Sequence, residues 1–336
     1  MRYSRKIECH QIVWLVAAAA QLGGATPGGA AAQDPTAALD TIRAMSLDSL
    51  ETGRAVTYFR RSDSARAALL HENLDAFARF SSDFAQSDLI IRSAVLSEQD
   101  WQRLSSMPYG FPHNIGPPAN LILAPAAAAT RRNADTLLTG RSAEMLYIGH
   151  EGGHLLTWSL MPAAMLDSLH VADDQMSPQL RARFARFDEI PGWYWEFAAS
   201  YFGLAFVATQ DGRDGAKVRT YMNGLSSGPT PRFHSLDECF AEMMQAQGPG
   251  NVPYVQTEAG SYNFGWCQGV VGRIAHSVWA RGVSIVEDIR RMVAAEGPIS
   301  TRAIIADLER RAPGLREELQ ALGVNYGQSA GSRPQP

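Results

Sequence analysis

The sequence predicts an α+β protein, with a mixed α/β first part and a mainly helical second part. Two short aliphatic runs before residue 125 have the length and composition of strands, whereas segments after residue 135 repeat their apolar residues at helical spacing. The composition suits such a fold, because 46% of the 336 residues are hydrophobic, which is enough for a sizeable core. Length alone suggests about two domains of roughly 150 residues, or one large domain with insertions.

The first part contains few expected elements. Residues 33–60 are rich in Ala, Asp and Thr and predict a loosely helical lead-in, and Ser64–Ala85 carries apolar residues near helical spacing, which predicts a helix. The other expected elements are a strand at Leu89–Leu96, a short helix at Gln99–Leu104, a turn at Pro108–Pro112 and a strand at Asn120–Ala124 that Pro125 ends.

The second part predicts a series of helices, because each segment has apolar residues at helical spacing. The chain closes with a polar, Gly- and Pro-containing tail at 326–336. The expected helices are Ala143–Leu160, Trp193–Thr209, Ser235–Gln247, Tyr262–Arg281, Ile285–Glu296 and Thr301–Arg311.

The first 32 residues have the features of a secretory signal peptide. Arg2, Arg5 and Lys6 form a positive start, an apolar run of about nine residues follows, and Ala30–Ala32 offers a small-residue cleavage site. That run is too short to span a bilayer. We therefore expect an exported protein, periplasmic or secreted, with no transmembrane segment after signal removal; an N-terminal membrane anchor is the alternative.

Charge and cysteine content narrow the class of protein. Removal of residues 1–32 leaves 304 residues (336 − 32) and changes the net charge from −4 to −6, because the segment carries three positive charges and one negative. An acidic chain argues against a nucleic-acid partner. Cys9 leaves with the signal, and the remaining Cys239 and Cys267 are too few for a disulfide scaffold. These two could form one disulfide bond or stay as separate buried thiols.

The chemistry is carried by an H-E-x-x-H motif, which stands at residues 150–154 as HEGGH. On a helix, residues i and i+4 share one face, so His150 and His154 can bind one zinc ion. Glu151 can then act as the general base for a zinc-activated water. The two glycines would let a neighbouring backbone or the substrate approach closely. The alternative is a pair of surface histidines on an ordinary helix.

A catalytic zinc site needs a third protein ligand. Glu196 is the strongest candidate, because it lies in a strongly apolar helix where an unpaired carboxylate would be costly. Asp188 and Glu189, in a predicted loop, are rival ligands or partners of a zinc-bound imidazole. His234, at a predicted helix start, is a further alternative, whereas His170 lies in an Asp-rich segment typical of a solvated loop.

Two further motifs resemble those of a known family. Trp193–Tyr201 reads WYWEFAASY and is similar to the second metal motif of the aminopeptidase N-like gluzincins, commonly W-L-N-E-G-F-A-S-Y. Tyr262–Gly265 reads YNFG and resembles that family's Y-E-K-G. The resemblance to these peptidase-MA-like proteins covers residues 85–320. It implies a zincin-like catalytic domain, Glu196 as the third zinc ligand, and Tyr262 as the residue that stabilises the oxyanion of the tetrahedral intermediate.

The departures from the family pattern are specific. The spacer between His154 and Glu196 has 41 residues, much longer than in the aminopeptidases, and its extra length at 160–190 reads as an insertion that could overhang the cleft. The family's G-x-M-E-N segment, which holds a substrate's free amine, has no counterpart, so aminopeptidase activity is unsupported. Trp195 and Phe197 replace the family's Asn and Gly, and the sequence does not explain Trp195.

These observations predict an exported zinc metallopeptidase of the gluzincin type that acts on a peptide or protein substrate. His150, His154 and Glu196 would bind zinc, and Glu151 and Tyr262 would be catalytic. One alternative is a zinc-binding scaffold protein without turnover, against which the intact Glu151 argues. Another is a zinc hydrolase that cleaves a non-peptide bond.

The expected organisation is a mixed α/β lobe at 33–140 and a helical, zinc-binding lobe at 141–325. By analogy with gluzincins, the strand at Leu121–Ala124 is expected to form the edge of the sheet beside the cleft. An extended peptide could add to that edge as a further strand.

Overall fold

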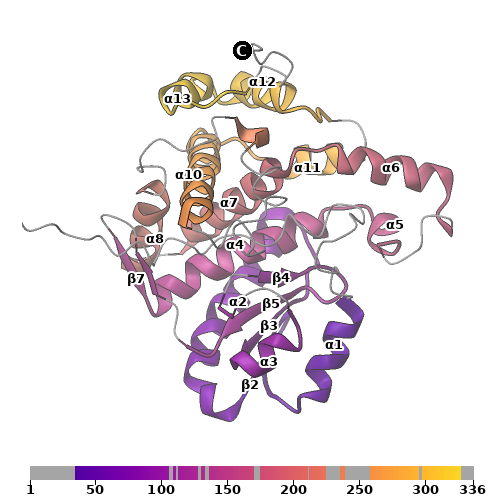
Figure 1. Cartoon of the computed structure of the whole chain (residues 1–336), viewed down its shortest axis with the longest axis vertical. Coiled ribbons are helices and arrows are strands. Elements are labelled where there is room, and N and C mark those ends of the chain that lie inside the picture. The colour runs from indigo at the N-terminus through magenta and orange to yellow at the C-terminus, as the bar shows by residue number, and fades with distance from the viewer. Residues whose placement is uncertain are drawn as a thin grey trace, which may run out of the picture.

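The computed structural model describes residues 35–105, 109–110, 113–127, 130–132, 136–169, 175–210, 212–224, 235–238, 258–294 and 297–326. All described strands lie between residues 48 and 139, and helices dominate the rest, so the protein is α+β (Figure 1). The expected signal peptide and all but the first residue of the expected tail lie outside the described residues.

A five-stranded mixed sheet forms the base of the molecule. Its strands run in the order β1-β2-β3-β5-β4, with β2, β3 and β5 parallel and the two outer strands antiparallel to their neighbours. A separate two-stranded hairpin, β6–β7, leads into the next helix. The strands are β1 Asp48–Thr52, β2 Ala55–Phe59, β3 Ile91–Leu96, β4 His113–Ile115, β5 Leu121–Pro125, β6 Thr130–Arg132 and β7 Leu137–Thr139.

The expectation that residues 33–60 form a loosely helical lead-in is wrong for most of this range. Only α1, Pro35–Ala44, is helical, and the β1–β2 hairpin follows it. Its two-residue connection begins with Gly53, whose φ of +50° suits a tight hairpin turn. Alternate residues from Ala55 to Phe59 are buried, which is the pattern of a strand that covers a core with one face.

The expectation that Leu121–Ala124 forms the sheet edge is also wrong. This segment is β5, which lies between β3 and β4, and all four of its residues are buried, as in a strand covered on both faces. The outer strand is β4, which has only three residues. Its polar His113 and Asn114 give no apolar alternation, so the sequence pattern did not reveal it.

Helices cover both faces of the sheet. α2, Ser64–Ala85, and α4, Arg141–Ser159, pack on one face, whereas α1 and α3, Glu98–Gln102, pack on the other (Figure 1). β5 shows the alternation directly, because Ile122 and Ala124 belong to the core shared with α2 and α4, and Leu121 and Leu123 to the core shared with α1 and α3. The larger core contains residues of both predicted lobes.

The second part packs its helices around α4, α7 and α10. Tyr201 of α7 donates to the carbonyl of Val283 at 2.8 Å, and the Trp193 indole donates to Thr301 at 2.7 Å, so the C-terminal helices are tied to α7. The helices are α5 Ala163–Leu166, α6 Pro178–Asp188, α7 Gly192–Thr209, α8 Arg213–Gly224, α10 Glu258–Ala280, α11 Val286–Val293, α12 Thr301–Arg311 and α13 Leu315–Ala321.

Most of the expected helices of the second part are present, with ends shifted by a few residues. Of the helix expected at Ser235–Gln247, only residues 235–238 are described, and there the amide of Glu238 donates to the Ser235 hydroxyl at 3.4 Å. Among the described residues, no helix is both long and apolar enough to cross a membrane.

Candidate metal centre

The two motif histidines lie one helical turn apart on α4, the helix that joins the sheet to the helical part. The side chains of His150 and His154 are only 3% and 4% exposed. Every residue of α4 from Ser142 to Trp158 is buried, because α2, α7 and the sheet cover the helix from several sides. A pair of surface histidines on an ordinary helix is therefore excluded.

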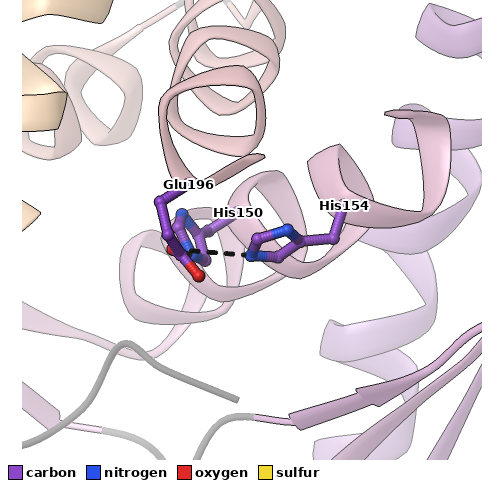
Figure 2. Close-up of side chains that lie close together, drawn as sticks. All are labelled: His150, His154 and Glu196. Carbon is purple, nitrogen blue, oxygen red and sulfur yellow. Dashed lines mark ion pairs between the residues drawn. The ribbon is translucent and has the colours of Figure 1, made fainter. Parts of the chain in front are cut away.

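Glu196 reaches the same point from α7. This helix is buried from Trp193 to Val207, and Glu196 itself is 0% exposed. Its Oε2 lies 3.4 Å from Nε2 of His150 and 3.6 Å from Nε2 of His154. Figure 2 shows the carboxylate of Glu196 and the two imidazoles turned toward one another from the two helices. The structure thus brings together the three residues predicted as metal ligands.

The spacing of these atoms fits a tetrahedral metal ion better than direct hydrogen bonds. A tetrahedron with bonds of about 2.1 Å has ligand atoms about 3.4 Å apart, close to the two measured separations, whereas N–H···O hydrogen bonds are usually about 2.7–3.2 Å long. Nε2 of His150 and Oε1 of Glu196 are buried without a hydrogen-bond partner among the described residues. A cation between the three side chains would satisfy Nε2 of His150.

The protonation states suit metal binding. Burial lowers the pKa of His154 to about 4, so that its imidazole is neutral at pH 7. Burial opposes ionisation of Glu196, but His154, His150 and Gln268 outweigh it and lower its pKa, which keeps the carboxylate anionic. Burial also opposes the charged form of His150, yet the Glu196 and Glu151 carboxylates raise its pKa. A bound cation would replace that proton.

The two glycines of the motif allow the close packing that brings the ligands together. A Cβ at Gly153 would lie 2.5 Å from the carbonyl oxygen of Ala199 on α7. At Gly152 it would lie 2.8 Å from the ring of Phe77 on α2. Gly153 thus makes room for the backbone of α7, whereas Gly152 makes room for an aromatic ring.

Glu151 is held by a residue that the sequence did not single out. The side-chain amide of Asn114 donates to Oε2 of Glu151 at 2.7 Å, and both residues are 1% exposed. Asn114 pairs with Ile122 across the β4–β5 ladder, so it lies on the sheet face that α4 covers. The neighbouring His113 lies on the opposite face, where burial lowers its pKa to about 4. No motif marked Asn114, because its contact depends on the register of a three-residue strand.

Gln268 is the second site residue missed by the sequence argument. Its side-chain amide, from α10, donates to Oε2 of Glu196 at 2.8 Å. The two residues are 72 positions apart, so only the packing of α10 against α7 brings them together. Tyr262, the first residue of the YNFG motif, lies on the same helix, but its side chain is outside the described part of the chain. The role predicted for Tyr262 stays a prediction.

The structure explains Trp195, which the sequence left unexplained. Its ring packs on Phe187 of α6, with centroids 4.7 Å apart, and Phe187 also packs on Trp158 of α4 at 6.0 Å. Trp158 lies one turn beyond His154, and Trp195 directly precedes Glu196. The segment at 160–190, predicted to be an insertion, is therefore joined through Phe187 to both metal-site helices. That it overhangs the cleft stays a prediction.

The two rival ligands that the structure describes do not join the site. Asp188 and Glu189 are exposed at the end of α6 and outside the His150, His154 and Glu196 group. His170 and His234 lie outside the described residues. Among the described residues, no other group of histidine, cysteine and carboxylate side chains is arranged to hold a metal ion.

The question left open for the cysteines is settled in part. Cys267 on α10 is disulfide-bonded and fully buried. The other two cysteines, Cys9 and Cys239, lie outside the described residues. Cys267 directly precedes Gln268, the residue of α10 whose amide reaches Glu196.

Chemically, the site combines two imidazoles and one carboxylate around a point next to a second carboxylate, that of Glu151. No protein-family model, no curated protein and no solved structure matches the chain. The resemblance to gluzincins therefore rests on the three sequence motifs alone.

Proposed function

We propose that this chain is an exported zinc-dependent peptidase of the gluzincin type, with a zincin-like catalytic domain. The observation that carries the proposal is the convergence of His150, His154 and Glu196 in a buried group whose spacing fits a tetrahedral ion. Two histidines and one carboxylate are a ligand set of catalytic zinc sites, in which the fourth position stays open. Imidazole ligands favour zinc over magnesium or calcium, which prefer oxygen ligands.

Each residue has a distinct role in the proposed reaction. When bound, zinc would activate a water molecule as nucleophile and polarise the carbonyl of the scissile bond. Glu151 would accept a proton from that water and return it to the leaving amine, so that the carboxylate would be regenerated in each cycle. Tyr262 is proposed to donate a hydrogen bond to the oxyanion of the tetrahedral intermediate.

The revised sheet order changes the expected position of the substrate. β4, and not β5, is the outer strand of the sheet, and it carries Asn114 next to Glu151. An extended peptide that binds by strand addition would therefore lie alongside β4. Main-chain hydrogen bonds of this kind would recognise a peptide backbone with little dependence on its side chains.

A peptide-library digest tests the proposal. The zinc-loaded chain without residues 1–32 is compared with Glu151→Gln, which has the same shape but cannot accept the proton, and with Glu189→Gln as a control that changes an exposed carboxylate. Wild type and Glu189→Gln are expected to cleave peptides, whereas Glu151→Gln binds zinc and loses about 100-fold or more in rate.

The alternatives give different outcomes in the same assay. Zinc binding without cleavage by the wild type would contradict the peptidase proposal and support a scaffold protein. Cleavage of esters or other non-peptide carbonyl compounds, with no cleavage of any peptide, would support the other hydrolase. Mass spectrometry of the products also separates cleavage within the chain from removal of terminal residues.

A further inference from the structure

Each of the two buried carboxylates of the candidate site is held by a neutral carboxamide from a different part of the chain. Asn114, on β4 of the sheet, donates to Glu151 at 2.7 Å. Gln268, on α10 of the helical part, donates to Glu196 at 2.8 Å. All four residues are at most 3% exposed, so both contacts are shielded from bulk solvent.

The Gln268 contact fixes the oxygen that faces the histidines. Oε2 of Glu196 accepts from Gln268 and is also the oxygen 3.4 Å from His150 and 3.6 Å from His154. A carboxylate oxygen has two lone pairs, so one can accept the amide while the other points to a cation. Without the amide, the carboxylate could rotate about its last bond and turn this oxygen away.

The Asn114 contact likewise fixes the orientation of the Glu151 carboxylate. An anionic carboxylate accepts hydrogen bonds only, so the amide nitrogen and not its oxygen must face it. Oδ1 of Asn114 has no hydrogen-bond partner among the described residues, and the bond to Glu151 is therefore the contact that orients this side chain.

The neutrality of both donors matters beside a metal site. A lysine or arginine in either place would repel the bound cation, and an aspartate or glutamate would repel the carboxylate. A carboxamide orients the carboxylate and leaves the charge of the site unchanged. Outer partners of metal ligands commonly affect affinity or activity about 10- to 100-fold.

We propose that Gln268 and Asn114 are positioning residues with separate tasks: Gln268 presents Glu196 to the metal and sets zinc affinity, whereas Asn114 holds Glu151 and leaves zinc affinity unchanged. The inference rests on the proposed function, because it takes Glu196 as a ligand and Glu151 as a base. Its test needs no turnover, so it can fail or succeed independently of peptide cleavage.

The first measurement is the zinc Kd, by competition with a chromophoric chelator. Gln268→Met, which keeps the length of the side chain without its donor, is expected to raise the Kd about 10- to 100-fold. Asn114→Leu is expected to change it less than about twofold. Asn73→Leu is the matched control, because Asn73 is a buried asparagine on α2 whose amide donates to the carbonyl of Leu69, and its zinc Kd should equal that of wild type.

The second measurement is the Kd of acetohydroxamate for the zinc-loaded protein. A hydroxamate loses its hydroxyl proton when it chelates a metal, and a correctly placed carboxylate receives that proton. Asn114→Leu is expected to weaken acetohydroxamate binding about 10-fold, as Glu151→Gln does, and to have no further effect in the Glu151→Gln background. Asn73→Leu again serves as the control.

Specific results would overturn the inference. It fails if Gln268→Met binds zinc as tightly as wild type, or if its effect persists in the Glu196→Gln background, where the contact it supports is already altered. It also fails if Asn114→Leu weakens zinc as much as Gln268→Met does. Thermal unfolding checks that each variant is folded, and the smaller Gln268→Ala and Asn114→Ala replace any variant that is not.

Discussion

Gly153→Ala probes the crossing of α4 and α7 on which the candidate metal site depends. The new Cβ would lie 2.5 Å from the carbonyl oxygen of Ala199 and 2.9 Å from its Cα. Ordinary contact begins at 3.4 Å, so the helices must separate by about 0.9 Å (3.4 − 2.5). The obstacle is backbone, which cannot rotate away as a side chain could.

The expected cost has two opposing parts. Overpacking of a close helix contact costs about 1–3 kcal/mol, and alanine returns about 1 kcal/mol of helix propensity. Because the clash is with backbone, we expect a net loss of about 1–2 kcal/mol in the free energy of unfolding. The same shift moves Glu196 away from His150 and His154. Since metal–ligand distances tolerate about 0.2 Å, zinc affinity should fall at least about 10-fold.

Two assays and one matched variant decide this prediction. Thermal unfolding gives the loss of stability of the metal-free protein, and chelator competition gives the zinc Kd. Gly272→Ala on α10 is the control, because an added Cβ there meets no atom of a neighbouring element within 4 Å in the described part of the chain. It should stabilise by about 0.5–1 kcal/mol and keep the zinc Kd. If Gly153→Ala behaved like Gly272→Ala, the reasoning would be refuted.

Four further predictions follow from the site and its surroundings. Glu196→Ala should lose zinc occupancy by metal analysis, whereas Glu189→Ala should keep it; equal occupancy in both would remove Glu196 from the ligand set. Zinc must displace the proton that the raised pKa of His150 favours. The zinc Kd should therefore rise about tenfold for each unit by which the pH falls below the pKa of His150, and a Kd independent of pH would contradict this. Phe187→Ala removes the ring between Trp158 and Trp195 and should cost about 3 kcal/mol in unfolding experiments, with earlier proteolysis within residues 160–190; unchanged proteolysis would show that α6 is held by other contacts. Removal of zinc by a chelator should lower the melting temperature, because a ligand at 100 times its Kd stabilises by about 2.7 kcal/mol, and an unchanged melting temperature would argue against tight binding.

The helices and the candidate metal ligands were predictable because the sequence features that mark them lie within single helices. The spacing of His150 and His154 depends on one helical turn, and Ser64–Ala85 has the same bounds in the sequence prediction and in the structure. Glu196 was identified because burying an unpaired carboxylate in an apolar helix costs free energy, so this residue needs a partner. Its partners are the two histidines and Gln268.

The missed features depend on contacts between distant segments. The order of β4 and β5 follows from sheet pairing, which a three-residue polar strand does not reveal. Asn114 and Gln268 carry no motif, and each acquires its role only when β4 or α10 packs beside a site carboxylate. Trp195 was left unexplained by the sequence for a similar reason, because its contact with Phe187 depends on how α6 lies beside α7. The β1–β2 hairpin, by contrast, had a usable local signal in Gly53 and the alternation of β2.

The most direct test of the central claim is a crystal structure of the zinc-loaded chain with anomalous diffraction measured on both sides of the zinc absorption edge. We expect one strong zinc peak about 2.0–2.2 Å from Nε2 of His150, Nε2 of His154 and a carboxylate oxygen of Glu196. A peak at other residues, or none at these three in protein that contains zinc, would contradict it.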